Sequence, residues 1–169
     1  MLSRRSTLAI LGAPSLGQST SLLASTAYPS KPLRWIVPYP AGGGSDFMAR
    51  VVGQPMSQAV SQSVFVDNKP GGNGAIAVAD LLRGPADGHT LINVDNGTLV
   101  FNPVLYSKLG YAPAKDLRLV TLVARAPMIL VVGPACTAKD AREFIAQARR
   151  QPGTQNFGSA GAGTPQHMA

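Results

Sequence analysis

The fold is decided by residues 33–60, which read LRWIVPYPAGGGSDFMARVVGQPMSQAV. The run Leu33–Val37 favours a β-strand, and the prolines and glycines after it predict a loop. Apolar residues then recur at helical spacing, which predicts a helix over about 46–61. Ser45 is the expected N-cap of this helix, and Asp46 lies in the first turn, where the helix dipole favours an acid.

The same alternation of strand, loop and helix continues along the chain. Further strands are predicted at residues 64–66, 90–94, 117–124, 128–132 and 155–158. A second helix is predicted at about 75–83, and a third begins at a Thr-x-x-Asp pattern formed by Thr137 and Asp140. Thr164 and Pro165 suit the N-cap and the first position of a last helix. The alternation predicts an α/β fold with a mostly parallel sheet.

The composition is that of a globular, loop-rich chain. Hydrophobic residues make up 45% of the 169 and charged residues 14%, which is too apolar for a disordered chain, while 18 glycines and 14 prolines indicate many turns. The formal net charge is +7, but the basic residues are scattered and aromatic residues are not interleaved with them. We therefore expect no nucleic-acid partner, although a mild positive field favours anionic ligands.

The first 27 residues have the three-part layout of an export signal. Arg4 and Arg5 are followed by a short apolar stretch and then by small residues that end at Ala27. The apolar stretch is far shorter than the roughly 20 residues that span a bilayer, so we do not expect it to anchor the chain. Cleavage is expected near Ala27, and the paired arginines leave both the Sec and the twin-arginine export routes open.

Two loops share one design. Each follows a predicted strand, is rich in small residues and leads into a predicted helix: residues 42–46 and residues 159–164. Small residues let the backbone approach a ligand closely, and a helix N-terminus presents backbone N–H groups that have no partner inside the helix. This arrangement favours main-chain binding of a carboxylate or a phosphate. Glycine loops also simply turn a chain between a strand and a helix, and that alternative stays open for either loop taken alone.

Nucleotide binding and hydrolysis have less support. Neither loop carries the Gly-Lys-Ser/Thr ending or the ordered G-x-G-x-x-G pattern of nucleotide-binding loops. Ser159 lacks the G-x-S-x-G elbow of serine hydrolases because residue 157 is Phe, and no acid follows Glu143 to orient His167. We therefore expect no catalytic residue, although an exported hydrolase that uses Ser159 or His167 remains a third alternative.

Metal and cofactor chemistry also lack their usual residues. The two histidines, His89 and His167, lie far apart in the sequence, and Cys136 is the only cysteine. A cysteine-based metal site and an intrachain disulfide are thus both excluded, and a histidine-based metal site has little support. We expect no metal and no cofactor.

Several motifs together resemble Bug-type (TctC-like) substrate-binding receptors of the tripartite tricarboxylate transporter family. The resemblance is densest in the opening YPSKPLRWIVPYPAGGGSD of residues 28–46, with Ala49 and Arg50 after it. It continues through nearly all of the chain after the signal. The later matching motifs are Val66–Gly71, Ala86–Leu91, Asn102-Pro103, Tyr111, Lys115-Asp116, Pro152-Gly153, Gly158–Gly161, Gly163-Thr164 and His167–Ala169.

The resemblance implies a type II periplasmic binding protein fold, in which two α/β lobes close on a ligand. Residues 28–125 would form the first lobe and residues 126–169 the start of the second. Such a receptor is periplasmic, and it delivers a small organic acid to membrane transporter subunits; we expect it to be a monomer. The two loops match those that hold a ligand carboxylate, with Asp46 expected mainly as a brace. The expected ligand-binding residues are Gly42, Gly43, Gly44, Ser45, Asp46, Thr98, Ser159, Ala160, Gly161, Gly163 and Thr164.

The sequence stops within its last predicted element. Only Gln166, His167 and Met168 follow Pro165 before Ala169, which is barely one helical turn. Because family members are longer, the rest of the second lobe and the returning part of the first lobe are expected to be missing. A nonfunctional truncated fragment of such a receptor is therefore the second hypothesis for this chain.

Overall fold

A three-stranded parallel sheet organises the part of the chain that the computed structural model describes, residues 27–169. Its strands are β1 (Leu33–Val37), β2 (Val64–Asn68) and β3 (Thr90–Ile92). The spatial order is β2-β1-β3, so β1 is the middle strand and pairs in parallel with both neighbours. The export signal predicted for residues 1–27 falls outside the described residues, apart from Ala27.

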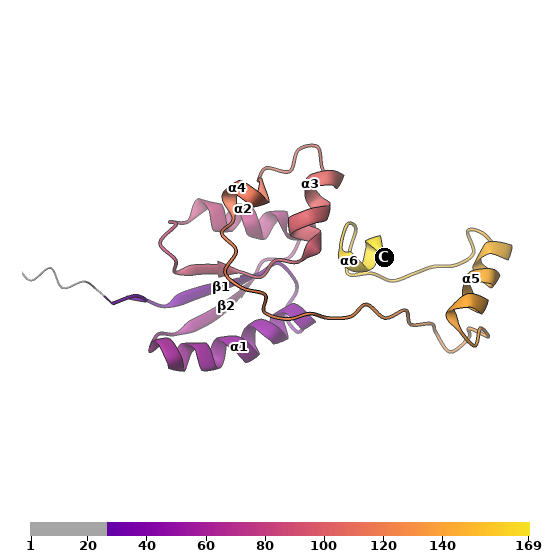
Figure 1. Cartoon of the computed structure of the whole chain (residues 1–169), viewed down its shortest axis with the longest axis horizontal. Coiled ribbons are helices and arrows are strands. Elements are labelled where there is room, and N and C mark those ends of the chain that lie inside the picture. Colours follow the sequence, from indigo (N-terminus) through magenta and orange to yellow (C-terminus); the bar gives the residue numbers. More distant parts are fainter. Residues whose placement is uncertain (1–26) are drawn as a thin grey trace, which may run out of the picture.

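Two helices cover the sheet, one on each face, as Figure 1 shows. They are α1 (Gly44–Val60) and α2 (Ala75–Arg83). Successive side chains of β1 point to opposite faces. Trp35 and Val37 pack against Ala49 of α1 in the hydrophobic core, whereas Arg34 forms an ion pair with Asp80 of α2. The middle strand is thus sealed from both sides, as a parallel sheet requires.

Short helical turns follow β2 and β3 in the sequence. They are η1 (Gly72–Gly74), the π-helical turn η2 (Gly97–Phe101), α3 (Asn102–Leu105) and α4 (Pro113–Asp116). η2 runs directly into α3, and Asn102 is fully buried at their junction. Thr98 of η2 and Asn102 of α3 are fully buried and polar, whereas α4 buries none of its residues.

The elements of the sheet lie close to their predicted positions. β1 and α2 have the predicted bounds, whereas β2 runs two residues beyond its prediction and β3 is two residues shorter. α1 begins two residues earlier than expected, with Gly43 as its N-cap, so Ser45 lies inside the first turn. The prediction of Ser45 as N-cap was wrong because the extended backbone of Gly43 already ends the loop.

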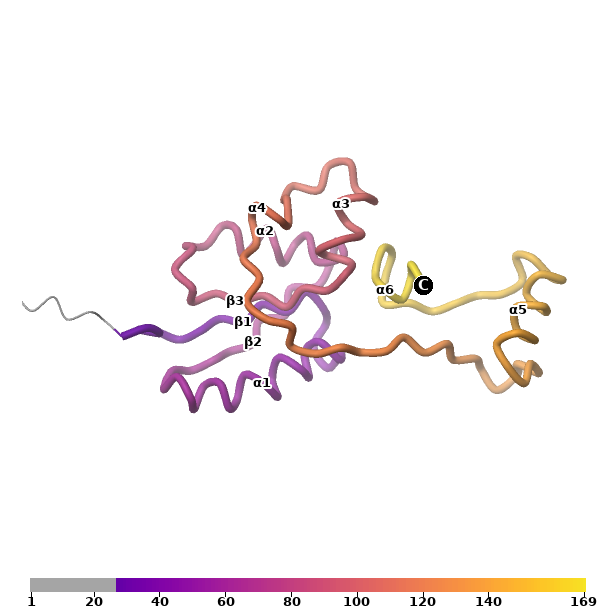
Figure 2. Tube along the Cα trace, in the orientation of Figure 1, coloured from indigo at the N-terminus to yellow at the C-terminus, as the bar shows by residue number. Residues whose placement is uncertain are grey.

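The chain beyond residue 116 has little secondary structure. Two helices occur there, α5 (Ala141–Arg150) and α6 (Pro165–Met168). Figure 2 shows the trace from residue 117 leaving the sheet as an extended stretch toward α5, which buries none of its residues. α5 is capped by Asp140, whose side chain accepts the Glu143 N–H at 2.8 Å, so the expected Thr137 start lies too early.

Three predicted strands are wrong. Residues 117–124, 128–132 and 155–158 run without strand pairing in the described structure, and most of their side chains are exposed. Their Val, Ile and Leu content favours an extended backbone, but a strand also needs a neighbour to accept its hydrogen bonds. No neighbouring strand is available to these segments within residues 27–169.

Candidate functional site

The order β2-β1-β3 creates a switch point at the carboxyl end of β1. The chain leaves β1 toward one side of the sheet and returns from β2 to the other side, so the loops after β1 and β3 diverge there. In open α/β sheets ligands bind in the crevice that such divergence leaves. The first glycine-rich loop follows β1 directly, which places residues 42–46 at this point.

Asp46 holds the first loop in shape. Its carboxylate accepts the backbone N–H of Gly42 at 2.9 Å, pairs with Arg50 at 2.9 Å and accepts the Asn68 side-chain amide at 3.1 Å. Hydrogen bonds from Arg50 and Gly42 lower the pKa of the Asp46 carboxyl from 3.8 to about 2. Asp46 is buried, so the structure places its carboxylate in the bracing role rather than on the loop surface.

The bracing leaves a defined set of main-chain donors. The Gly42 N–H is taken by Asp46, and the Gly43 N–H lies 3.4 Å from the carbonyl oxygen of Pro40. The next three N–H groups belong to the first turn of α1, where no intrahelical partner exists. Within the described residues, Gly44, Ser45 and Asp46 donate no backbone hydrogen bond. Because α1 is 17 residues long, its dipole adds positive potential at these donors.

The residues after β3 form hydrogen bonds with β1 and with the loop and helix that follow it. Asn93 accepts the Trp35 indole N–H at 2.7 Å and donates its own amide to the Ser45 carbonyl oxygen at 3.2 Å. Asp95 accepts the Tyr39 hydroxyl at 2.5 Å. Burial and the neighbouring Asp95 raise the pKa of Tyr39 well above its ordinary value, so the phenol stays protonated. Sequence reasoning missed these residues, although their position directly after a strand was a usable signal.

Thr98 is a buried support in this structure. Its side chain has no exposed surface, and its backbone N–H donates to Asp95 at 3.1 Å. The Thr98 carbonyl oxygen accepts the hydroxyl of Tyr111 at 2.8 Å. A side chain without exposed surface cannot line an open crevice, so the expected direct role of Thr98 is not what the structure displays.

The second loop, residues 159–164, is held mainly by its own hydrogen bonds. Ser159 Oγ lies 3.3 Å from the Gly161 N–H, and the Thr164 hydroxyl donates to the Gly161 carbonyl oxygen at 2.7 Å. The Gly163 N–H lies 3.3 Å from Nδ1 of His167. Among the described contacts of this loop, only the backbone amides of residues 159, 160 and 162 are left without a partner.

Both loops border the same edge of the sheet. The loop before α2 follows β2, which is parallel to β1, so it lies at the carboxyl edge as well. In that loop, Asn73 donates its side-chain amide to the Gly163 carbonyl oxygen at 2.8 Å, and Gly74 lies close to Pro38, the residue directly after β1. Asn73 thus ties the second loop to the neighbourhood of the first. The described hydrogen bonds include none directly between residues 42–46 and 159–164.

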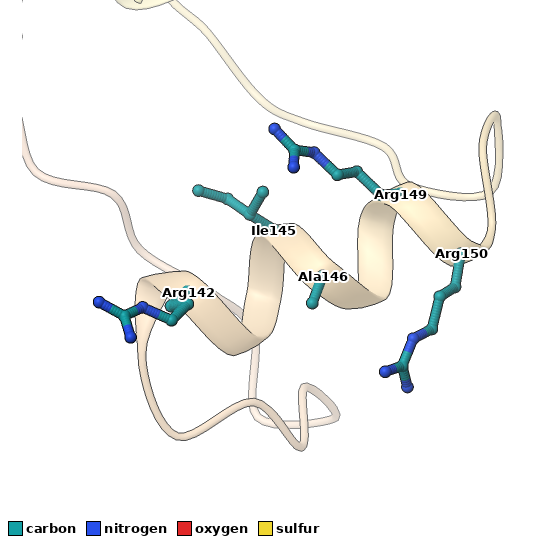
Figure 3. A pocket seen from close by; sticks show the side chains of 5 residues that line it. All are labelled: Arg142, Ile145, Ala146, Arg149 and Arg150. Carbon is teal, nitrogen blue, oxygen red and sulfur yellow. The ribbon is translucent and has the colours of Figure 1, made fainter.

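Two surface hollows lie away from this edge. One lies along α5, lined by Arg142, Ile145, Ala146, Arg149 and Arg150, and Figure 3 shows its three arginines spread away from the helix. The other lies between α1 and β2, beside Ala49 and Phe65. Neither contains a residue of the two glycine-rich loops. A hollow built on one helix offers no enclosed space, so we do not regard it as the ligand site.

Metal binding and membrane spanning find no support in the described residues. Between residues 27 and 169, no group of three His, Cys, Asp or Glu side chains is placed to hold a metal ion. No helix in that range has both the length and the apolar character needed to cross a bilayer.

The chain is similar in sequence to several known proteins. A UPF0065 protein encoded in the tcbD-tcbE intergenic region of Pseudomonas sp. strain P51 is 35% identical over 99% of this chain and 50% of its own length. The chain thus spans about half the length of the curated relatives it matches.

Two solved structures share the fold at useful sequence identity. R. palustris Rpa4515 with adipate matches 74% of this chain and 42% of its own, with a TM-score of 0.70 at 33% identity. MatC from Rhodopseudomonas palustris with bound malate matches 72% and 42%, with a TM-score of 0.67 at 30% identity. The α/β fold of this chain is therefore part of a periplasmic binding protein fold, as the family resemblance implied.

The sequence profile described as tripartite tricarboxylate transporter family receptor matches residues 48–169, which is well over half of the chain. The match includes the second glycine-rich loop and the Asn73 loop that holds it. The chain therefore belongs to the TctC family of tripartite tricarboxylate transporter receptors.

Proposed function

We propose that this chain is a solute-binding receptor that captures a small carboxylate at the carboxyl edge of its sheet. The observation that carries the proposal is the first turn of α1, where the N–H groups of Gly44, Ser45 and Asp46 are free above a loop braced by Asp46. Free N–H groups at the positive end of a long helix bind carboxylates without a basic side chain. Gly42 and Gly43 shape this turn rather than donate to the ligand.

The second loop would supply the remaining contacts. Its unpaired amides at Ser159, Ala160 and Ala162 lie beside small residues, which permit close approach by a ligand. Ser159 and Thr164 add hydroxyls, although that of Thr164 is buried and already donates to Gly161. We therefore assign Ser159 and Ala160 to ligand contact, and Gly161, Gly163 and Thr164 to the shape of the loop.

The ligand class follows from the site and from the relatives. Main-chain donors recognise a carboxylate without reading the rest of the molecule, and the two solved relatives carry adipate and malate, both of them dicarboxylates. We propose a small organic acid as the solute, delivered to membrane subunits of a tripartite transporter. The family and the export signal predicted for residues 1–27 support a location in the periplasm. The family also supports a role in binding rather than in catalysis.

Calorimetric titration of the purified chain tests this function. Adipate and malate at pH 7 are expected to give saturable heats, whereas the corresponding neutral diamides give none because they lack the carboxylate charge. Thermal melting should rise with ligand concentration as mass action requires. A chain that melts cooperatively yet binds neither acid would refute the proposed function.

A second candidate is that the 169-residue chain is an inactive part of a receptor. The exposure of the apolar residues between 117 and 132 favours it, because an exposed apolar stretch of that length is unusual on a monomeric protein. Circular dichroism and melting decide between the two candidates. Absence of a cooperative transition would favour the inactive part, and an in-frame stop followed by receptor sequence in the DNA would support it further.

A further inference from the structure

We infer that Asn73 is a positioning residue of the carboxylate site, because its side-chain amide fixes the second loop against the carboxyl edge of the sheet. The inference rests on the proposed function, because it assumes that the second loop binds a carboxylate. The contact between Asn73 and that loop can be tested without ligand. Asn73 Nδ2 donates to Asn102 Oδ1 at 2.7 Å and to the Gly163 carbonyl oxygen at 2.8 Å. One amide group thus contacts both Asn102, 29 residues further along the chain, and Gly163, 90 residues further along.

Asn73 is itself held rigidly. Its backbone is left-handed, with φ 47° and ψ 46°, which few residues other than glycine and asparagine adopt readily. The Asn73 carbonyl oxygen accepts the Asn102 side-chain amide at 2.8 Å, and the same Asn102 amide lies 3.0 Å from the Tyr111 hydroxyl. Because Asn102 is fully buried, the amide of Asn73 is anchored to the packed interior on one side and presented to the second loop on the other.

The second loop fits Asn73 closely. Gly163 has φ +77°, and a β-carbon built on it would lie 3.0 Å from Asn73 Nδ2 and 3.3 Å from a methyl group of Leu105. Glycine at this position therefore permits both the backbone conformation and the short approach to Asn73. The next residue, Thr164, is only 2% exposed, so the contact buries the end of the loop.

The orientation of the amide shows which side of it matters. Asn73 Oδ1 is buried without a hydrogen-bond partner, which costs free energy. The side-chain amide nevertheless has the orientation in which its two N–H groups donate to Asn102 and Gly163. Donation by the amide, rather than the shape of the side chain alone, is thus what fixes the second loop against the end of the sheet, while the loop's own hydrogen bonds set its internal shape.

Hydrogen–deuterium exchange of the ligand-free chain tests the positioning role. Asn73→Gly tolerates the left-handed backbone and removes the amide, so exchange at residues 163–169 should become about five- to thirty-fold faster for two lost hydrogen bonds. Exchange in β1 should stay unchanged. Ser61→Gly is the matched control, because Ser61 also has a positive φ, 52°, but caps α1 away from this contact. It should leave residues 163–169 unaffected.

A second variant separates donation from packing. Asn73→Asp preserves the shape of the side chain but supplies no N–H at pH 7, so it should release residues 163–169 as Asn73→Gly does. Wild-type exchange in Asn73→Asp, or acceleration spread equally over the sheet in either variant, would overturn the inference. Titration with adipate gives the functional readout, with Kd expected to rise five- to thirty-fold in both variants.

The role of Asn73 and the binding of a carboxylate can fail separately. If the loop is released but the Kd for adipate is unchanged, Asn73 positions the loop and not the carboxylate site, and the inference is wrong. If wild-type chain binds no acid while exchange changes locally as expected, the proposed function fails and the contact between Asn73 and the second loop stands.

Discussion

The carboxylate of Asp46 and the backbone N–H of Gly42 close the first glycine-rich loop with a hydrogen bond of 2.9 Å. This bond links the first turn of α1 back to the loop that precedes it, and it consumes a donor that a ligand would otherwise use. The same carboxylate pairs with Arg50, one helical turn further along α1. An acid can thus lie beside a turn that is proposed to bind a carboxylate, because its charge is already paired with Arg50.

The first prediction concerns pH. Because the pKa of Asp46 is lowered to about 2 in the folded chain, its contribution to stability is fully present above about pH 4 and is lost as pH falls toward 2. Asp46→Asn should remove this part of the pH dependence. Urea unfolding at pH 5 and pH 2.5 measures it. The pKa of Asp87 is also lowered to about 2, and its contribution to stability depends on pH in the same way in wild type and in Asp46→Asn. The difference in pH dependence between the two proteins therefore measures Asp46 alone.

The second prediction removes one proposed donor from the site. Proline is well accepted at the first position of a helix, and the extended Gly43 before it suits a following proline. Gly44→Pro should therefore fold normally and weaken adipate binding by about 1.5–3 kcal/mol, the usual worth of a hydrogen bond to a charged group. Gly44→Ala is the control, since its β-carbon meets nothing within 4 Å and its N–H is retained. Equal affinities of the two variants would exclude this donor.

The third prediction concerns the buried polar layer beside the site. Tyr111→Phe removes a hydroxyl that donates to the Thr98 carbonyl oxygen at 2.8 Å and accepts from Asn102 at 3.0 Å. Leaving these buried groups unpaired should lower the free energy of unfolding by about 1–3 kcal/mol, measured in urea. Tyr106→Phe should have little effect, because Tyr106 is 40% exposed and its hydroxyl makes no hydrogen bond within the described residues.

The fourth prediction compares two glycines that share φ +77°. A β-carbon at Gly153 would meet nothing within 4 Å, so Gly153→Ala should cost only the strain of a left-handed alanine, about 1 kcal/mol. Gly163→Ala adds the close approach to Asn73 and should cost more, and it should weaken adipate binding as well. Thermal melting and titration of both variants provide the comparison. A larger loss of stability in Gly153→Ala would contradict the assigned contacts.

The fifth prediction addresses the extended segment. Ile129 and Val131 are 77% and 81% exposed in a run of apolar residues, which should promote self-association. Replacing both with Lys should reduce the concentration-dependent mass seen in sedimentation velocity, without shifting the melting of the sheet. If wild-type chain sediments as a single monomer at all concentrations, these residues do not drive association.

The local signals in the sequence were sufficient for the sheet, its covering helices and α6, located α5 within a few residues, and failed for the extended segments after residue 116. β1 and α2 were located correctly because a β-favouring run, a glycine loop and a periodic apolar face agree within each short segment. The segments at 117–124 and 128–132 have the same β-favouring composition, but strand formation depends on a neighbour that composition does not reveal. Local preference therefore overstated the extent of regular structure after residue 116.

The sequence indicated both loops but not how they are held. The first loop lies at the carboxyl end of β1, whereas the second follows no strand and is held near that end through Asn73. Which N–H groups are free depends on bonds made elsewhere. Gly42 and Gly163 look equivalent to Gly44 in sequence, yet their N–H groups are engaged by Asp46 and His167. Asn73 was missed because its proposed role depends on a contact with Gly163, 90 residues away, and local sequence patterns do not predict such contacts.

All the strand pairs described here join residues 33–37 to residues 64–68 and 90–92. When the chain is synthesised or threaded through a membrane from its N-terminus, every strand of the sheet is available once residue 92 has emerged. The sheet and its two covering helices can then fold while the residues after 92 are still held inside the ribosome or the translocation channel. The loop around Gly163 arrives at a surface that is already formed.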